Sequence, residues 1–149
     1  MSAVIRAGGS NFDVDVFLSG GTLPVCDVFR RGEPVYPWSK PTDRPREASS
    51  VVVDVSEAGF DEFALQMEDA VAFLTSEDQQ VRRLCSWPGV ETATLAFGIA
   101  RREVAAQTDH LPTEFVRLAG ALGLAIEVSH YAVSDVDEGG VDDGTHSGG

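Results

Sequence analysis

The sequence of 149 residues has few cysteines and no long apolar run, and each absence excludes a class of protein. Its two cysteines, Cys26 and Cys85, are too few for a disulfide framework. Each follows an apolar residue, which is typical of a buried free thiol. No apolar run approaches the roughly 20 residues of a membrane-spanning helix, and the first residues do not resemble a signal peptide. These features favour a cytoplasmic protein.

Positive charge is also scarce, because 11 Lys and Arg residues stand against 24 Asp and Glu residues, for a formal net charge of -13. The electrostatic field of this negative charge repels nucleic-acid backbones and anionic membranes, since binding to either needs cationic contacts. We therefore predict no nucleic-acid partner and no membrane partner. The same field would attract a protein with a basic surface, although solubility alone is the plainer explanation of the acidity.

The motifs of common enzyme classes are missing. The sequence contains neither Gly-x-x-x-x-Gly-Lys nor Gly-x-Gly-x-x-Gly, and it has no Gly-x-Ser-x-Gly turn. The three histidines lack the spacing of a zinc site. Cys85 with His130 is the sharpest catalytic pair, but Cys85 shares a helical register with Val81 and Leu84, which favours packing in the core. We predict no catalytic residue, no metal site and no cofactor.

Hydrophobic periodicity predicts five strands and three helices. The predicted strands cover residues 12–18, 25–29, 50–55, 90–99 and 124–132. The predicted helices cover residues 60–75, a short segment between Ser76 and Pro88, and residues 112–122. Apolar and acidic residues alternate over residues 12–18, as in a strand with one buried face. Ser76 and Gln79 have the spacing of a capping box for the second helix.

This order of elements predicts an α+β fold, a two-layer sandwich. We expect one largely antiparallel or mixed sheet of about five strands, with two or three helices on one face. Residues 1–133 would form a single globular domain. Residues 134–149 are rich in Asp, Gly, Ser and Thr, so we predict a disordered acidic tail there.

A loop with unusual side chains is predicted between the second and third strands. Residues 33–48 contain four prolines, which exclude regular structure and favour an extended loop. Guanidinium forks beside exposed aromatic rings could bind a carboxylate or a peptide, because Arg, Tyr and Trp are enriched at binding hot spots. The alternative is a purely structural loop. The candidate partner-binding residues are Arg30, Arg31, Glu33, Tyr36 and Trp38.

The sequence also resembles an uncharacterised family of small bacterial α+β domains of unknown function. The resemblance covers roughly residues 12–132. It rests on the acidic-apolar opening segment, the Arg-Arg-Gly-Glu turn at residues 30–33, the valine-rich strand before a long helix and the stretch at residues 118–131. The resemblance implies a compact α+β fold and no established activity. In size and acidity the chain is similar to bacterial immunity proteins.

Three hypotheses about function follow. The first is a non-enzymatic protein-binding domain, such as an immunity or regulatory factor, that engages a basic partner. The second is a small enzyme or ligand-binding domain, in which a pocket gathers Arg30, Arg31 and His130. The third is a structural domain that associates with itself as a homodimer through an open sheet edge.

Overall fold

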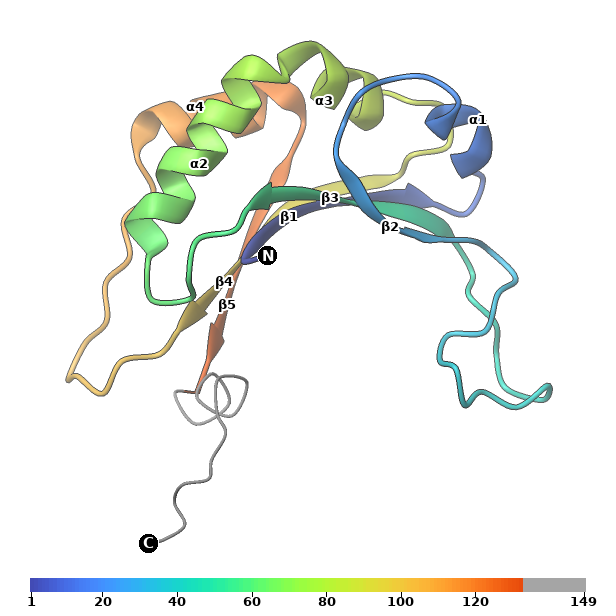
Figure 1. Ribbon diagram of the computed structural model, residues 1–149, viewed down its shortest axis with the longest axis horizontal. Coiled ribbons are helices and arrows are strands. Elements are labelled where there is room, and N and C mark those ends of the chain that lie inside the picture. Colours follow the sequence, from blue (N-terminus) through green and yellow to red (C-terminus); the bar gives the residue numbers. More distant parts are fainter. Residues whose placement is uncertain (133–149) are drawn as a thin grey trace, which may run out of the picture.

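The computed structural model describes residues 1–132, which form five strands and four helices (Figure 1). The strands are β1 (Ala3–Gly9), β2 (Val25–Phe29), β3 (Ser49–Ser56), β4 (Thr92–Ala100) and β5 (Ala125–Tyr131). The helices are α1 (Val14–Leu18), α2 (Phe63–Ser76), α3 (Asp78–Cys85) and α4 (Thr113–Leu122). The predicted α+β class is confirmed. The predicted tail at residues 134–149 lies outside the described residues.

The strands form one open mixed sheet in the order β2-β3-β1-β4-β5. The central strand, β1, is antiparallel to both β3 and β4, and β2 is antiparallel to β3. Because β3 and β4 both oppose β1, they run in the same direction, and α2 with α3 connects them across β1. α4 connects β4 to its parallel neighbour β5. Strands β2 and β5 are therefore the two edges of the sheet.

A single core joins the sheet to the helices. Alternate residues of the inner strands are buried, among them Ile5 and Phe97, which are at most 1% exposed. They pack in one cluster with side chains from all four helices: Phe17, Met67, Leu84 and Phe115 are examples. Figure 1 shows α2, α3 and α4 grouped above the sheet in that view. On the alternate positions of β1, Val4 is half-buried and Arg6 is exposed.

The strand predicted over residues 12–18 is wrong, since this segment forms helix α1. The Asp13 side chain caps the helix by accepting a hydrogen bond from the backbone N–H of Val16, at 3.2 Å. Val14 and Phe17 are buried three residues apart, which is helical spacing. A run of seven residues is too short for alternation alone to separate a strand from one turn of helix. This helix brings the total to four, one more than expected.

The central strand, β1, was not predicted. Its sequence, Ala-Val-Ile-Arg-Ala-Gly-Gly, contains small residues that are uncommon in strands. In the sheet the two glycines are required. A Cβ atom on Gly8 would collide with the carbonyl oxygen of Ser49, and one on Gly9 would collide with that of Gly89. The close approach of neighbouring backbone therefore explains the glycines, and this constraint is invisible in local sequence.

The predicted capping box at Ser76 and Gln79 is also wrong. The Ser76 hydroxyl donates back to the carbonyl oxygen of Phe73 at 3.4 Å, and the backbone N–H of Glu77 donates to the same oxygen at 2.8 Å. No side chain caps the start of α3. Only Glu77 separates the two helices. At the end of α4, by contrast, Gly123 adopts the left-handed conformation (φ 86°) that its predicted role as a stop requires.

Candidate functional site

The β2–β3 loop, residues 30–48, extends beyond the sheet at the β2 edge (Figure 1). Two backbone hydrogen bonds hold its base together. The N–H of Gly32 donates to the carbonyl of Arg46 at 2.9 Å, and the N–H of Arg46 donates to that of Glu33 at 2.8 Å. At the tip, a turn is closed by the N–H of Ser39 and the carbonyl of Tyr36, at 3.0 Å. These hydrogen bonds within the loop fix both its base and its tip.

Tyr36 and Trp38 form a stacked aromatic pair on this loop. Their ring centroids lie 4.9 Å apart and their planes differ by 5°. The two residues remain 53% and 75% exposed. Large apolar surface that stays in water without support from the core is a frequent mark of an interaction site. Each ring also limits the rotamers of the other, so the pair is ordered before any partner arrives.

The two predicted arginines are engaged inside the molecule. The Arg30 guanidinium donates to both carboxylate oxygens of Asp15 on α1, at 2.7 and 3.3 Å. This contact holds the pKa of the Asp15 carboxyl below its usual range. Arg31 donates from its side chain to the carbonyl of Ser10 at 3.2 Å. Their forks therefore tie the loop to the N-terminal part of the domain.

Glu33 also has a structural role, since its carboxylate accepts a hydrogen bond from the backbone N–H of Arg30 at 2.9 Å. The five predicted partner-binding residues thus divide into two sets. Arg30, Arg31 and Glu33 shape the turn, whereas Tyr36 and Trp38 present exposed surface. The structure does not combine the guanidinium forks and the aromatic rings into one site.

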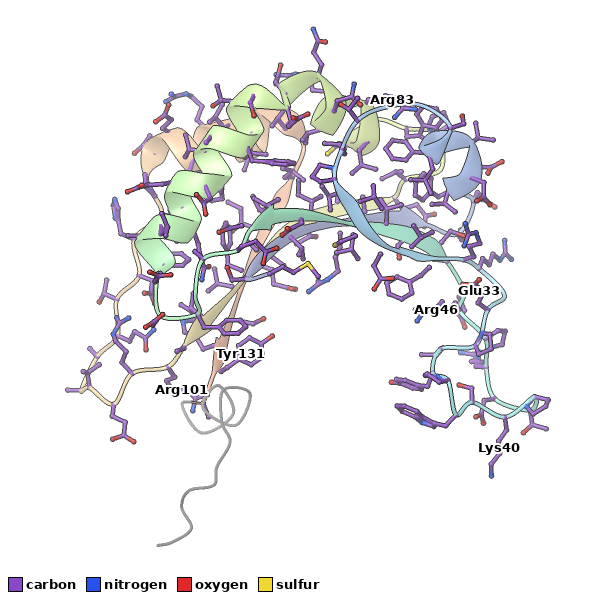
Figure 2. The ribbon with its side chains drawn as sticks, viewed as in Figure 1. Glu33, Lys40, Arg46, Arg83, Arg101 and Tyr131 are labelled. Atoms are coloured by element: carbon purple, nitrogen blue, oxygen red, sulfur yellow. The ribbon has the colours of Figure 1, made fainter. Side chains whose placement is uncertain are left out.

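Arg46 is a loop residue that the sequence reasoning missed. Its guanidinium carbon lies 4.1 Å from the centroid of the Phe29 ring, and its Nη2 donates to the carbonyl of Val35 at 3.1 Å. Figure 2 shows Arg46 at the base of the loop and Lys40 farther out. One side chain therefore joins both arms of the loop to the end of β2. A lone arginine near a proline-rich segment gives no signal of this contact in the sequence.

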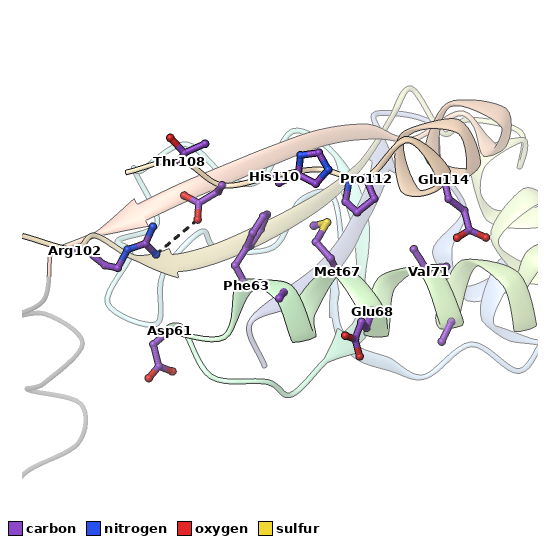
Figure 3. Close-up of a pocket in the computed structure, with 13 residues that line it drawn as sticks. Asp61, Phe63, Met67, Glu68, Val71, Arg102, Thr108, His110, Pro112 and Glu114 are labelled. Carbon is purple, nitrogen blue, oxygen red and sulfur yellow. Dashed lines mark ion pairs between the residues drawn. The ribbon is translucent and has the colours of Figure 1, made fainter. Parts of the chain in front are cut away.

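A second feature is a groove between α2 and the segment 108–114, with a volume of about 740 Å³ (Figure 3). Apolar side chains of α2 form one wall: Phe63, Met67 and Val71. Pro112 lines the groove from the other segment. Exposed acidic residues also line it: Asp61, Glu68 and Glu114. Sequence reasoning missed this groove, because its two walls are far apart in the chain.

Asp109 fixes the connector that forms one side of the groove. Its carboxylate lies 3.8 Å from the Arg102 guanidinium, and it accepts a hydrogen bond from the Gln107 side-chain amide at 3.1 Å. His130 Nε2 on β5 lies 3.6 Å from the same carboxylate. His130 therefore belongs to the β5 edge, whereas Arg30 and Arg31 follow β2 at the opposite edge. The predicted convergence of these three residues in one pocket does not occur.

The cysteines give no sign of a reactive thiol. Burial raises the pKa of the half-buried Cys85 thiol to about 11, so the nucleophilic thiolate is disfavoured. The prediction of a buried Cys26 is wrong, because this residue is exposed on the edge strand β2. Partial desolvation of its sulfur, followed by the nearby Asp54 carboxylate, raises the pKa of Cys26.

Asp54 on β3 has a carboxyl group whose pKa is clearly raised. Burial, followed by a hydrogen bond that the protonated Asp54 carboxyl donates to the neighbouring Glu57 carboxylate, raises its pKa to about 6. A raised carboxyl pKa can mark a proton donor. Asp54, however, lines neither the groove nor the aromatic loop, and we assign it no catalytic role.

Residues 1–132 hold no group of three His, Cys, Asp or Glu side chains placed to bind a metal ion. Within the same residues, no helix has both the length and the apolar character needed to cross a membrane.

Comparison with known proteins adds no functional information. The chain matches no protein-family model, no curated protein and no solved structure. The resemblance to an uncharacterised bacterial family therefore stays a prediction.

Proposed function

We propose that this chain is a non-enzymatic protein-binding domain that docks a basic partner through Tyr36 and Trp38. An immunity or regulatory factor is the kind of role that this binding would serve. The observation that carries the proposal is the stacked pair itself, which is exposed at 53% and 75% on a hydrogen-bonded loop. Two large rings are thus presented to solvent where the fold has no need of them.

The side chains of the pair, the held loop and the charge of the chain all favour binding. Trp and Tyr bury much area for few rotatable bonds, and they are among the residues that dominate binding energies. Because the loop is already held by Arg30, Arg31 and Arg46, less conformational entropy is lost when a partner docks. The net charge of -13 would raise the association rate of a basic partner, and salt would weaken this effect.

The test is affinity capture from the lysate of the native host, followed by mass spectrometry. Wild-type protein is compared with the double variant Tyr36→Ala/Trp38→Ala at low and moderate salt. We expect a basic protein to be captured by the wild type, less strongly at moderate salt, and to be lost with the double variant. Binding of the purified partner is then measured by titration in a Trp87→Phe background, so that Trp38 is the only tryptophan of this chain and its fluorescence is the readout.

The matched control is Val104→Ala, which removes apolar surface from a residue that is 55% exposed but lies on the β4–α4 connector. This variant should capture the partner as the wild type does. The proposal fails if the wild type captures no protein above background, or if the aromatic double variant captures the same partner equally well.

A further inference from the structure

We propose that the groove between α2 and residues 108–114 binds a short basic amphipathic segment of a partner protein. Apolar side chains of the segment would lie on the α2 wall, and its Lys or Arg side chains would reach the acidic rim. This site is distinct from the aromatic loop. One wall of the groove, residues 108–114, comes after β4 in the chain, and β4 lies next to the edge strand β5. The aromatic loop instead follows β2, which is the other edge of the sheet (Figure 1).

The apolar wall follows one line along α2. Phe63, Met67 and Val71 stand at positions i, i+4 and i+8, so they share one face of the helix. Phe63 and Met67 are only 9% and 3% exposed and form the floor of the groove. The half-buried Val71 and the exposed Ala64 and Ala72 therefore supply its accessible apolar area. Figure 3 shows Phe63 and Met67 pointing toward the segment that carries His110 and Pro112. At 1.5 Å per residue, this line extends over about 12 Å of the helix. An extended peptide covers that length with about four residues.

The rim carries acidic side chains that have no ion-pair partner in the part of the chain that the structure describes. Asp61 precedes α2, Glu68 lies in its middle, and Glu114 lies in the first turn of α4. All three are exposed, and none takes part in an ion pair within residues 1–132. The nearest basic side chain of the lining, Arg102, faces Asp109 at 3.8 Å. The groove therefore offers apolar area bordered by uncompensated negative charge.

This combination favours a basic protein segment over other occupants. A small amine could neutralise one carboxylate, whereas the rim presents three from separate parts of the chain. A second copy of the chain would bring the same acidic rim into contact with itself. Residues 133–149 of this chain contain five Asp and Glu residues and no Lys or Arg, so they also lack charge complementarity. A segment of alternating basic and apolar residues can place its apolar side chains on the wall and its basic side chains beside the carboxylates of the rim.

The experiment uses the full chain and three short fluorescein-labelled peptides of equal length in fluorescence anisotropy titrations. One peptide repeats Lys-Leu, the second repeats Lys-Ser and the third repeats Glu-Leu. We expect saturable binding of the Lys-Leu peptide only, because it alone has both basic and apolar side chains. The proposal is overturned if the Lys-Leu peptide fails to bind at low salt. It is also overturned if the Lys-Ser peptide binds equally well, since the overall field would then explain the binding.

Variants locate the binding. Glu68→Gln together with Glu114→Gln should weaken binding of the Lys-Leu peptide about fivefold or more, with little change in fold, since both residues are exposed. Ala64→Arg places a positive side chain on an exposed position of the wall and should abolish binding. The matched control Glu103→Gln removes one charge from an exposed residue outside the groove, and it should act less than Glu68→Gln alone. Equal effects of these two single variants would overturn the proposal.

The outcome is separable from that of the proposed function. Tyr36→Ala/Trp38→Ala should leave binding of the Lys-Leu peptide unchanged, because those residues lie outside the groove. Circular dichroism of each variant confirms that it is folded. Peptide binding in the groove would support this inference even if the aromatic loop captured no partner. Capture through the aromatic loop would likewise support the proposed function even if the groove bound no peptide.

Discussion

The two tryptophans of the chain lie in opposite environments. Trp87 packs edge-on against Phe17, with centroids 5.3 Å apart, and the Arg83 guanidinium lies 4.6 Å from its ring. Trp38 stacks on Tyr36 and is 75% exposed. The region around Trp87 is thus held by packing against the core. The loop around Trp38 is held by hydrogen bonds and by one cation–π contact with Phe29.

This difference separates what an aromatic ring can do for folding from what it can do for binding. Trp87, Phe17 and Arg83 stabilise the fold because each covers apolar area of the others. Trp38 covers little apolar area of the domain, so most of its own apolar surface stays in water until a partner buries it. Substitutions around Trp87 should therefore lower the free energy of unfolding much more than substitutions around Trp38. Substitutions around Trp38 should weaken partner binding much more than substitutions around Trp87.

The largest effect on stability is expected at Phe17, which is 2% exposed and contacts Phe12 and Trp87. Phe17→Ala should lower the free energy of unfolding by about 3–5 kcal/mol, because it removes a buried ring and leaves a cavity. Urea unfolding followed by circular dichroism measures this loss. Phe17→Leu retains most of the volume and should cost clearly less. A loss below about 1 kcal/mol for Phe17→Ala would contradict the core role of this region.

Arg83 should have the next largest effect. Its guanidinium lies 4.4 Å from the Phe17 ring centroid and donates to the Phe17 carbonyl at 2.9 Å. The turn at Gly21, with φ 93°, leaves the space for this side chain. Arg83→Ala should lower the free energy of unfolding by about 2 kcal/mol, since two ring contacts and one hydrogen bond are lost.

Arg83→Lys tests the reason for that loss. Lysine keeps the charge but not the planar fork that contacts two rings, so it should recover only part of the stability in the same urea titration. Full recovery would show that charge alone matters at this position.

At the loop, Arg46→Ala should lower the free energy of unfolding by only about 1 kcal/mol, because the cation–π contact lies at the edge of the domain. Its main effect should be local. In a Trp87→Phe background, where Trp38 is the only tryptophan, acrylamide should quench the fluorescence more strongly after the substitution. Arg44→Ala is the control, because within residues 1–132 Arg44 pairs only with Glu47 and its side chain is 86% exposed. Equal quenching in both variants would argue against Arg46 as the anchor of the loop.

The smallest effect on stability is expected for Trp38→Ala, at less than about 1 kcal/mol, since an exposed stacked pair adds little to folding. The same variant should lose most of the partner captured by the wild type. Thermal unfolding and capture, measured on one preparation, test both statements. A large loss of stability would mean that Trp38 belongs to the folding framework and not to a binding surface.

The sequence predicted much of the α+β fold because its longer elements repeat one period over many residues. The helix of Phe63, Met67 and Val71, the valine-rich strand β3 and the stop at Gly123 were all found within a few residues of their observed positions. The segment at residues 12–18 failed because its apolar residues alternate in the sequence, whereas the structure buries Val14 and Phe17 at helical spacing and leaves Val16 53% exposed. Strand β1 failed because its glycines serve contacts with distant backbone.

The candidate sites were predicted less completely than the fold. The exposure of Tyr36 and Trp38 could be predicted because aromatic residues in a proline-rich loop cannot reach a core easily, while their part in binding stays a prediction. The engagement of Arg30 by Asp15 could not, since an arginine fork can bind a partner or its own chain equally well. The groove was missed because α2 and residues 108–114 are joined only by folding.

By itself, the sequence determined the acidic charge, the α+β class and the exposed aromatic loop, because these depend on composition and local periodicity. Only the tertiary structure decided which arginines are occupied, that His130 meets Asp109, and where apolar and acidic side chains meet in a groove. The physical reason is distance along the chain. Side chains from separate elements acquire a shared chemistry only when the packing of the core fixes them beside one another.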